Sequence, residues 1–130
     1  RRGALPKLSR LTLIASLLGN QGMAALAAPL RKLPALTRLL LWNNDIGDEG
    51  VASLFANLGK DDFKALEKLW LGYNEITDAG MTTLVAALDA GRLPRLHNGT
   101  KDDIMFFLQT NRASASAVQA VEDALAKRSQ

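Results

Sequence analysis

Residues 36–50 read LTRLLLWNNDIGDEG, and residues 66–80, at an offset of 30, read LEKLWLGYNEITDAG. Both stretches follow the pattern L-x-x-L-x-L-x-x-N-x-I-x-D-x-G, and two further leucines follow each of them. At an offset of 28 the preceding segment also fits, with Ser16 at the Asn position and Asn20 at the Asp position. Three copies in register predict a protein built from one repeating structural unit.

A fourth, degenerate copy follows the third. The run 93–96 (LPRL) repeats the run 33–36 (LPAL), but the expected Leu-x-Leu does not come directly after it. The pattern resumes with an apolar and polar set at the earlier spacings, namely Phe106, Leu108, Asn111, Val121 and Leu125. We therefore predict an insertion near 97–103 and one domain, 1–130, with repeats at about 5–32, 33–62, 63–92 and 93–127.

Each copy has the signals of a short strand followed by a helix. The alternating leucines point to one side of a strand, and the Asn can bond backbone groups where the chain leaves it. Asp48 and Asp78 stand where a helix N-cap is expected. Apolar residues then recur at helical spacing, at Val51, Leu54, Phe55 and Leu58 and at Met81, Leu84, Val85 and Leu88. Because one unit cannot bury its leucines alone, we expect parallel units that share a continuous core.

This motif resembles the leucine-rich repeat, specifically the ribonuclease-inhibitor-like subclass that NOD-like receptors, tropomodulin and the Ran GTPase-activating protein share. The resemblance is strong over about 5–90 and weak over 91–127. It implies an α/β fold, a short solenoid of about four strand–helix repeats with a parallel sheet on the concave face and helices outside. It also implies that exposed concave residues bind another protein. The irregular first and last copies are typical of capping repeats and also of a truncated array.

Strand alternation predicts which side chains reach the concave face. If Leu39 and Leu41 are buried, then Arg38, Leu40 and Trp42 point the other way. Equivalent positions form a basic column, Arg10, Arg38 and Lys68 followed by Met105, and an apolar column, Thr12, Leu40, Trp70 and Phe107. Both tryptophans and the only tyrosine therefore fall on this face, and Trp, Tyr and Arg are enriched at binding hot spots. We predict a partner-binding set of Arg10, Arg38, Leu40, Trp42, Lys68, Trp70, Tyr73 and Phe107. The alternative is that a neighbouring segment of the chain covers the rings.

Charge is distributed unevenly along the chain. Residues 1–44 contain seven Lys or Arg and no acid, residues 45–90 have a net charge of −6, and residues 91–130 have +2, for a total of +3. The basic column is either simply solvated or steers an acidic partner.

The composition excludes several kinds of chemistry. Without cysteine the chain has no disulfide, no thiol nucleophile and no Cys-based zinc site, and His97 is its single histidine. The adjacent acids Asp61-Asp62 and Asp102-Asp103 are interpreted as helix starts or solvated turns. We expect no enzymatic activity, cofactor, metal or small-molecule substrate, and no apolar run reaches the roughly 18 residues of a membrane span. The absence of cysteine favours an intracellular, reducing compartment, either the cytoplasm or an organelle interior.

The leading hypothesis is a non-enzymatic protein–protein interaction module, or a scaffold subunit covered within a large assembly. The alternative is a GTPase-regulating leucine-rich-repeat protein, implied by the resemblance to the Ran activator, although no residues match that function specifically. A third hypothesis is a nucleic-acid-binding surface, because basic residues interleave with Trp and the isoelectric point is about 9.5. The acidic centre of the chain and the three cations of the basic column argue against this third hypothesis.

Overall fold

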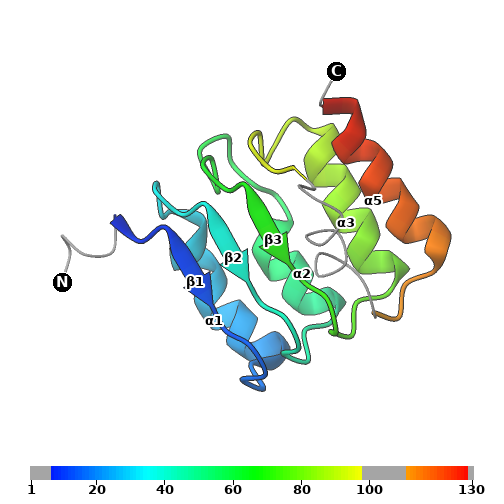
Figure 1. Ribbon diagram of the computed structural model, residues 1–130, viewed down its shortest axis with the longest axis horizontal. Helices are drawn as coiled ribbons and strands as arrows, with labels where there is room; N and C mark the ends of the chain where they lie inside the picture. The colour runs from blue at the N-terminus through cyan, green and yellow to red at the C-terminus, as the bar shows by residue number, and fades with distance from the viewer. Residues whose placement is uncertain (1–6, 98–110, 129–130) are drawn as a thin grey trace.

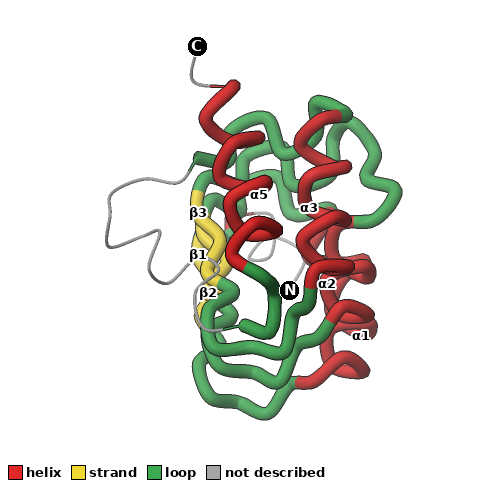
Figure 2. The backbone as a smooth tube through the Cα atoms, turned by 90° about the vertical axis from the view of Figure 1, so that its right-hand side faces the viewer, coloured by secondary structure: helices red, strands yellow, loops and turns green. Residues whose placement is uncertain are grey.

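The computed structural model describes residues 7–97 and 111–128. Strands and helices alternate along the chain, in the order β1 (Arg10–Thr12), α1 (Gly19–Arg31), β2 (Arg38–Leu40), α2 (Asp48–Phe55), β3 (Lys68–Trp70), α3 (Asp78–Asp89) and α5 (Ala115–Arg128). The strands form one layer and α1, α2 and α3 form a second layer on one side of it (Figure 1, Figure 2). Helix α5 packs against α3. The described part of the chain is thus the short α/β solenoid that the repeat predicts.

The three strands form a parallel sheet in the order β1-β2-β3. Arg10 pairs with Arg38, and Arg38 pairs with Lys68. Two residues after these positions, Leu40 of β2 pairs with Thr12 on one side and with Trp70 on the other. The register across these strands is therefore the predicted one, while Met105 and Phe107, which were predicted to extend the two columns, lie outside the described residues.

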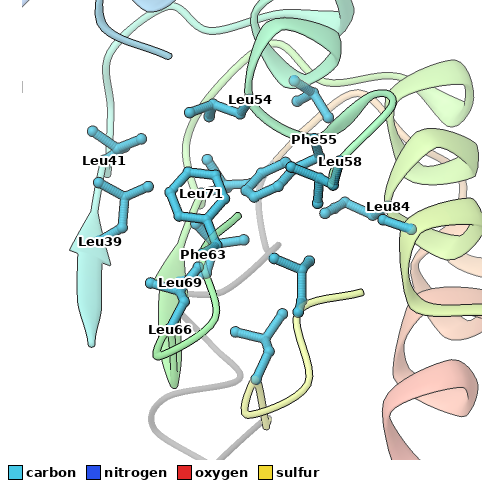
Figure 3. Packing of buried hydrophobic residues seen from close by; sticks show 14 of the residues in the cluster. Leu39, Leu41, Leu54, Phe55, Leu58, Phe63, Leu66, Leu69, Leu71 and Leu84 are labelled. Atoms are coloured by element: carbon cyan, nitrogen blue, oxygen red, sulfur yellow. The ribbon is translucent and has the colours of Figure 1, made fainter. Parts of the chain in front are cut away.

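The core lies between the sheet and the helices, and most of it is built from the repeated leucines (Figure 3). Leu39 and Leu41 are fully buried, and Leu54 and Phe55 of α2 pack in the same cluster. Phe63, which precedes β3, is also fully buried, and its ring centroid lies 5.5 Å from that of Phe55. Removing these side chains from water is the main contribution to stability.

The repeated asparagines satisfy backbone groups of two neighbouring units. The buried Asn74 accepts hydrogen bonds at Oδ1 from the N–H groups of Asn44 (2.8 Å) and Ile46 (3.0 Å). Its Nδ2 donates to the carbonyl oxygens of Leu41 and Leu71, both at 3.0 Å. The predicted role of this Asn at the strand exit is confirmed, and the bonds also join one unit to the next.

Asn111 makes the same kind of bonds as Asn74, one unit further along. Its Oδ1 accepts from the Ile76 N–H at 3.0 Å, and its Nδ2 donates to the Leu71 carbonyl at 2.9 Å. In the helix that follows, Val121 and Leu125 are buried in the common core. Asn111 and α5 therefore continue the pattern of the earlier units.

The prediction that Asp48 and Asp78 cap their own helices is wrong. The N-cap residue of α2 is Gly47, and Asp48 Oδ1 instead accepts from the N–H groups of Thr77 (2.8 Å) and Gly80 (3.0 Å) at the start of α3. Asp78 Oδ1 likewise accepts from the Ser114 N–H at 2.6 Å, just before α5. Stacking brings the start of each helix beside the start of the next, so each carboxylate satisfies free N–H groups of the following unit.

Helix α2 is shorter than its apolar spacing predicts. It ends at Phe55, so Leu58 is buried but lies outside the helix. Arg31, at the end of α1, donates to the carbonyl oxygens of Ser53 (3.2 Å), Ala56 (3.1 Å) and Asn57 (3.0 Å). These bonds satisfy carbonyls that a continued helix would have used, and they stabilise the turn that ends α2.

Candidate protein-binding surface

The predicted site lies on the face of the sheet opposite the helices, which we call the concave face. Arg10 of β1 and Arg38 of β2 are exposed there, side by side in the register. Lys68 of β3 is half-buried next to them. Neighbouring parallel strands are about 4.8 Å apart, so the three positions place basic groups close together. Among the described residues, no acid forms an ion pair with Arg10 or Arg38.

The apolar column presents less surface than its composition suggests. Leu40 is only 9% exposed, although it lies on the opposite side of β2 from the core leucines Leu39 and Leu41. Its register partner Trp70 is half-buried. Directly opposed side chains on one face of a sheet contact each other, and a large ring covers much of a leucine. The expectation that Leu40 is exposed on the concave face is therefore wrong.

Two aromatic side chains form a pair where β2 and β3 end. The ring centroids of Trp42 and Tyr73 lie 4.9 Å apart with an interplanar angle of 66°, which is an edge-to-face arrangement. Tyr73 is 46% exposed, while Trp42 is half-buried. The backbone of Tyr73 is left-handed, with φ of 56°, and turns the chain sharply after the strand. The repeat pattern does not predict this conformation, because a bulky residue rarely adopts it.

Acidic residues stand beside the aromatic pair. Asp45 and Glu75 are exposed in the two loops that follow the strands. Glu75 forms an ion pair with Arg112, with Oε1 and Nε 2.7 Å apart. The strands therefore carry basic residues, and the loops after them carry two exposed acids, of which Glu75 is paired with Arg112.

Asp62 lies away from this face and is not the solvated turn residue that the sequence suggests. It is only 4% exposed and forms ion pairs with Lys32 at 2.6 Å and Arg31 at 3.3 Å. Burial raises the pKa of its carboxyl, but hydrogen bonds from Lys32 and the Gly59 N–H outweigh this, and the net pKa is lowered from 3.8. Its neighbour Asp61 is exposed. Asp62 therefore has a structural role between the two helical units.

The remaining predictions concern other parts of the chain. Phe107 lies outside the described residues, and His97 is exposed. Within 7–97 and 111–128, no three acidic or histidine side chains are placed to hold a metal ion. No helix in these ranges is both long and apolar enough to cross a bilayer.

Comparison with known proteins agrees with the repeat and the fold. The family model described as Leucine Rich repeat matches residues 32–55 and 65–85. Among solved structures, "Leiomodin-1 Actin-Binding Site 2 (ABS2)" is similar, with a TM-score of 0.65 and 17% identity, over 95% of this chain and 82% of that chain. A search of the curated proteins gave no significant match. Residues 32–55 and 65–85 therefore match the leucine-rich repeat, and the described residues form a short α/β solenoid of strand–helix units, as that fold does.

Proposed function

We propose that the chain is a non-enzymatic interaction module of the ribonuclease-inhibitor-like subclass, and that it binds a partner protein through the concave face. The observation that carries this proposal is the pair of exposed arginines, Arg10 and Arg38, at directly neighbouring positions of β1 and β2. The Trp42–Tyr73 aromatic pair lies where β2 and β3 end. Arginine and large aromatic rings are the side chains that most often contribute strongly to protein–protein affinity.

The charge of this surface favours an acidic partner. Residues 1–44 contain no Asp or Glu, so nothing in that part of the sequence neutralises Arg10 and Arg38. Guanidinium groups bind carboxylates through two parallel hydrogen bonds, and a basic patch speeds the encounter with an acidic surface. We therefore propose a partner that presents carboxylates to β1 and β2 and an apolar or aromatic group to Tyr73.

Charge reversal tests this proposal. Affinity capture from native extract, followed by mass spectrometry, would supply the partner, and actin is one protein to include because the similar structure is an actin-binding one. The double variant Arg10→Glu/Arg38→Glu should weaken binding by at least tenfold, because it places like charges opposite the partner. The matched control is Lys60→Glu/Lys127→Glu, which makes the same change in net charge at exposed residues outside the sheet. Equal loss of affinity in both variants would contradict the proposal.

The tryptophans test the apolar part of the same surface. The double variant Trp42→Ala/Trp70→Ala should weaken partner binding by more than about 2 kcal/mol. Both rings are half-buried, so circular dichroism and urea unfolding must first show that the variant is folded. Unchanged binding by the folded variant would exclude the aromatic residues from the interface.

We also propose that the protein works in a reducing, intracellular compartment, which the absence of cysteine supports. A fluorescent fusion of the full-length protein, imaged in its native cell, would test this.

Light scattering on the isolated chain separates an independent module from an obligate subunit of an assembly. A monodisperse monomer supports the module, and aggregation that a partner reverses supports the subunit.

A further inference from the structure

The outer edge of β1 presents backbone groups that no described strand uses. Directly before and after β1, the Ser9 carbonyl and the Leu13 N–H bond to residues of the second unit. In a parallel ladder, alternate residues of a strand direct their backbone groups to opposite sides. The N–H groups of Arg10, Thr12 and Ile14 therefore point away from β2. Within the described ranges, β1 is an edge of the sheet.

The core is also less covered at this end of the molecule. Leu11 and Leu13 are half-buried, whereas Leu39 and Leu41, their equivalents in the second unit, are fully buried. Each repeat is covered by its neighbours on both sides, and the β1 unit has a described neighbour on one side only. A further strand beside β1 would cover these leucines.

An exposed leucine marks the same end. Leu17 is 80% exposed and has a left-handed backbone, with φ of 51°. Ile14 nearby is 45% exposed. Asn or Gly fits a left-handed backbone better than Leu does. A leucine side chain that stays in water also contributes no hydrophobic stabilisation to the fold. The presence of Leu17 there is accounted for if a partner contacts it.

Charge selects among the possible occupants of this edge. Lys7 and Arg10 are exposed at this end of the sheet, Arg38 is exposed next to Arg10 on β2, and residues 1–44 contain no acid. A second copy of this chain, docked through the same edge, would place its own Lys7 and Arg10 against these charges, and such like-charge contacts are unfavourable. An acidic segment has the opposite charge and is attracted.

We infer that the outer edge of β1 binds an extended, acidic segment of a partner protein, which adds to the sheet as a further strand. Its backbone bonds the outward groups of Arg10, Thr12 and Ile14. Because side chains alternate along a strand, its apolar residues cover Leu11 and Leu13, and its acidic residues lie on the concave face beside Arg10. This surface is the edge of the sheet rather than its concave face, so it goes beyond the proposed function.

A synthetic peptide with alternating charge and apolarity, acetyl-EVEVEVE-amide, is the probe. In NMR titration of the ¹⁵N-labelled full chain, we expect shift changes over 8–18 and at least tenfold slower hydrogen exchange at the Arg10, Thr12 and Ile14 amides. The peptide acetyl-KVKVKVK-amide has the same pattern with opposite charge and should bind at least tenfold more weakly.

Two variants separate edge binding from other modes. Thr12→Pro removes an outward N–H and leaves the bonds between β1 and β2 in place, so it should weaken the probe's binding about five- to tenfold relative to Thr12→Ala. If Thr12→Pro does not fold, Leu17→Asn suits the left-handed backbone and removes only the exposed apolar contact. It should weaken binding at least threefold, with Gln21→Ala as an exposed control on α1.

Three results would overturn the inference. The first is no binding of the acidic peptide at concentrations up to about 1 mM, the weak end of the usual affinity range. The second is perturbation centred on Trp42 and Trp70, which would assign the peptide to the concave face. The third is concentration-dependent dimerisation that Thr12→Pro abolishes, which would make the edge an interface between two copies of this chain.

Discussion

Asn74 bonds backbone groups of its own unit and of the preceding one, and Asp48 bonds backbone groups of the following unit, so both side chains fix how closely the units stack. Asn74 reaches the N–H groups of Asn44 and Ile46, and Asp48 reaches those of Thr77 and Gly80. Leucines supply the burial, but hydrophobic contact is non-directional and does not set a register by itself. The hydrogen bonds of the buried Asn74 and the partly buried Asp48 add that direction, because a polar group removed from water must be bonded at a defined geometry.

Replacing Asn74 with leucine should lower the free energy of unfolding by about 3 to 5 kcal/mol, because several buried backbone groups lose their partner at once. Urea unfolding measured by circular dichroism would check this value. Asn43→Gly is the matched control, since Asn43 is exposed and its left-handed φ of 59° suits glycine. A loss below about 1 kcal/mol for Asn74→Leu, similar to that of the control, would show that the asparagine bonds are dispensable.

Gly80 illustrates why the repeat requires a glycine at the start of a helix. A Cβ atom at Gly80 would lie 2.5 Å from Ile76 Cγ2 and 2.6 Å from Asp48 Oδ1. One at Gly50 would lie 2.7 Å from Ile46 Cγ2 and 2.8 Å from Asn20 Oδ1. The carboxylate or amide that satisfies the next helix leaves no room for a side chain. The glycine that ends the repeat pattern, at Gly50 and Gly80, is therefore required by a contact between units, which the sequence of one unit does not reveal.

Gly80→Ala should therefore destabilise the protein by about 1 to 3 kcal/mol, although alanine favours a helix more than glycine does. Gly59→Ala is the control, because its nearest contact would be an ordinary 3.6 Å, to Asp62 Oδ2. We expect Gly59→Ala to be neutral within about 0.5 kcal/mol. Thermal unfolding of both variants measures the difference, and an increase in stability for Gly80→Ala would refute the steric explanation.

At the level of the elements, strands and helices were predictable where the signal was local. The L-x-x-L-x-L pattern placed β2 and β3, and apolar spacing placed α2 and α3. The end of α2 was not predictable, because it depends on Arg31, which belongs to the preceding unit. The partners of Asp48 were missed for the same reason, since a single unit does not contain them.

Asp62 connects the end of α1 to the turn before β3, and its pKa gives a pH-dependent test. Because its folded pKa is lowered, its contribution to stability is present above the ordinary value of 3.8 and is lost as pH falls through the folded pKa. Asp62→Asn should cost about 1 to 3 kcal/mol near neutral pH, since it leaves Arg31 and Lys32 without their carboxylate.

Urea unfolding of Asp62→Asn and wild type between about pH 7 and about pH 2 would check this prediction. The stability difference should shrink towards acid, where the wild-type carboxyl is also protonated. Asp61→Asn, at the exposed neighbour, should show no such trend. A difference that stays constant over this range would mean that the ion pairs contribute nothing.

At the scale of the whole molecule, the solenoid is a row of units that contact only their neighbours, so its stability should be uneven. The β1 unit has half-buried leucines at positions where the β2 unit has fully buried ones. Local opening costs least where few apolar contacts are broken. We expect amides of β1 and α1 to exchange with deuterium at least tenfold faster than those of β2 and β3. Uniform protection in hydrogen-exchange mass spectrometry would indicate a single cooperative unit instead.

The candidate site was only partly predictable from the sequence. Strand alternation placed Arg10, Arg38 and Lys68 in one column, and the pairing of the strands shows that column. Exposure was harder to predict, because it depends on neighbours on the same face. Leu40 is covered although it lies outside the core cluster, and Tyr73 is more exposed than Trp42.

The central claim is that the concave face contacts the partner, and site-specific photo-cross-linking in native extract tests it most directly. A benzophenone amino acid would be placed at position 38, on β2, and separately at position 127, on the outward side of α5. We predict a discrete cross-linked protein from position 38 that is absent from position 127, and its loss when Arg10 is changed to Glu. A product from position 127 alone, or equal products from both positions, would contradict the claim.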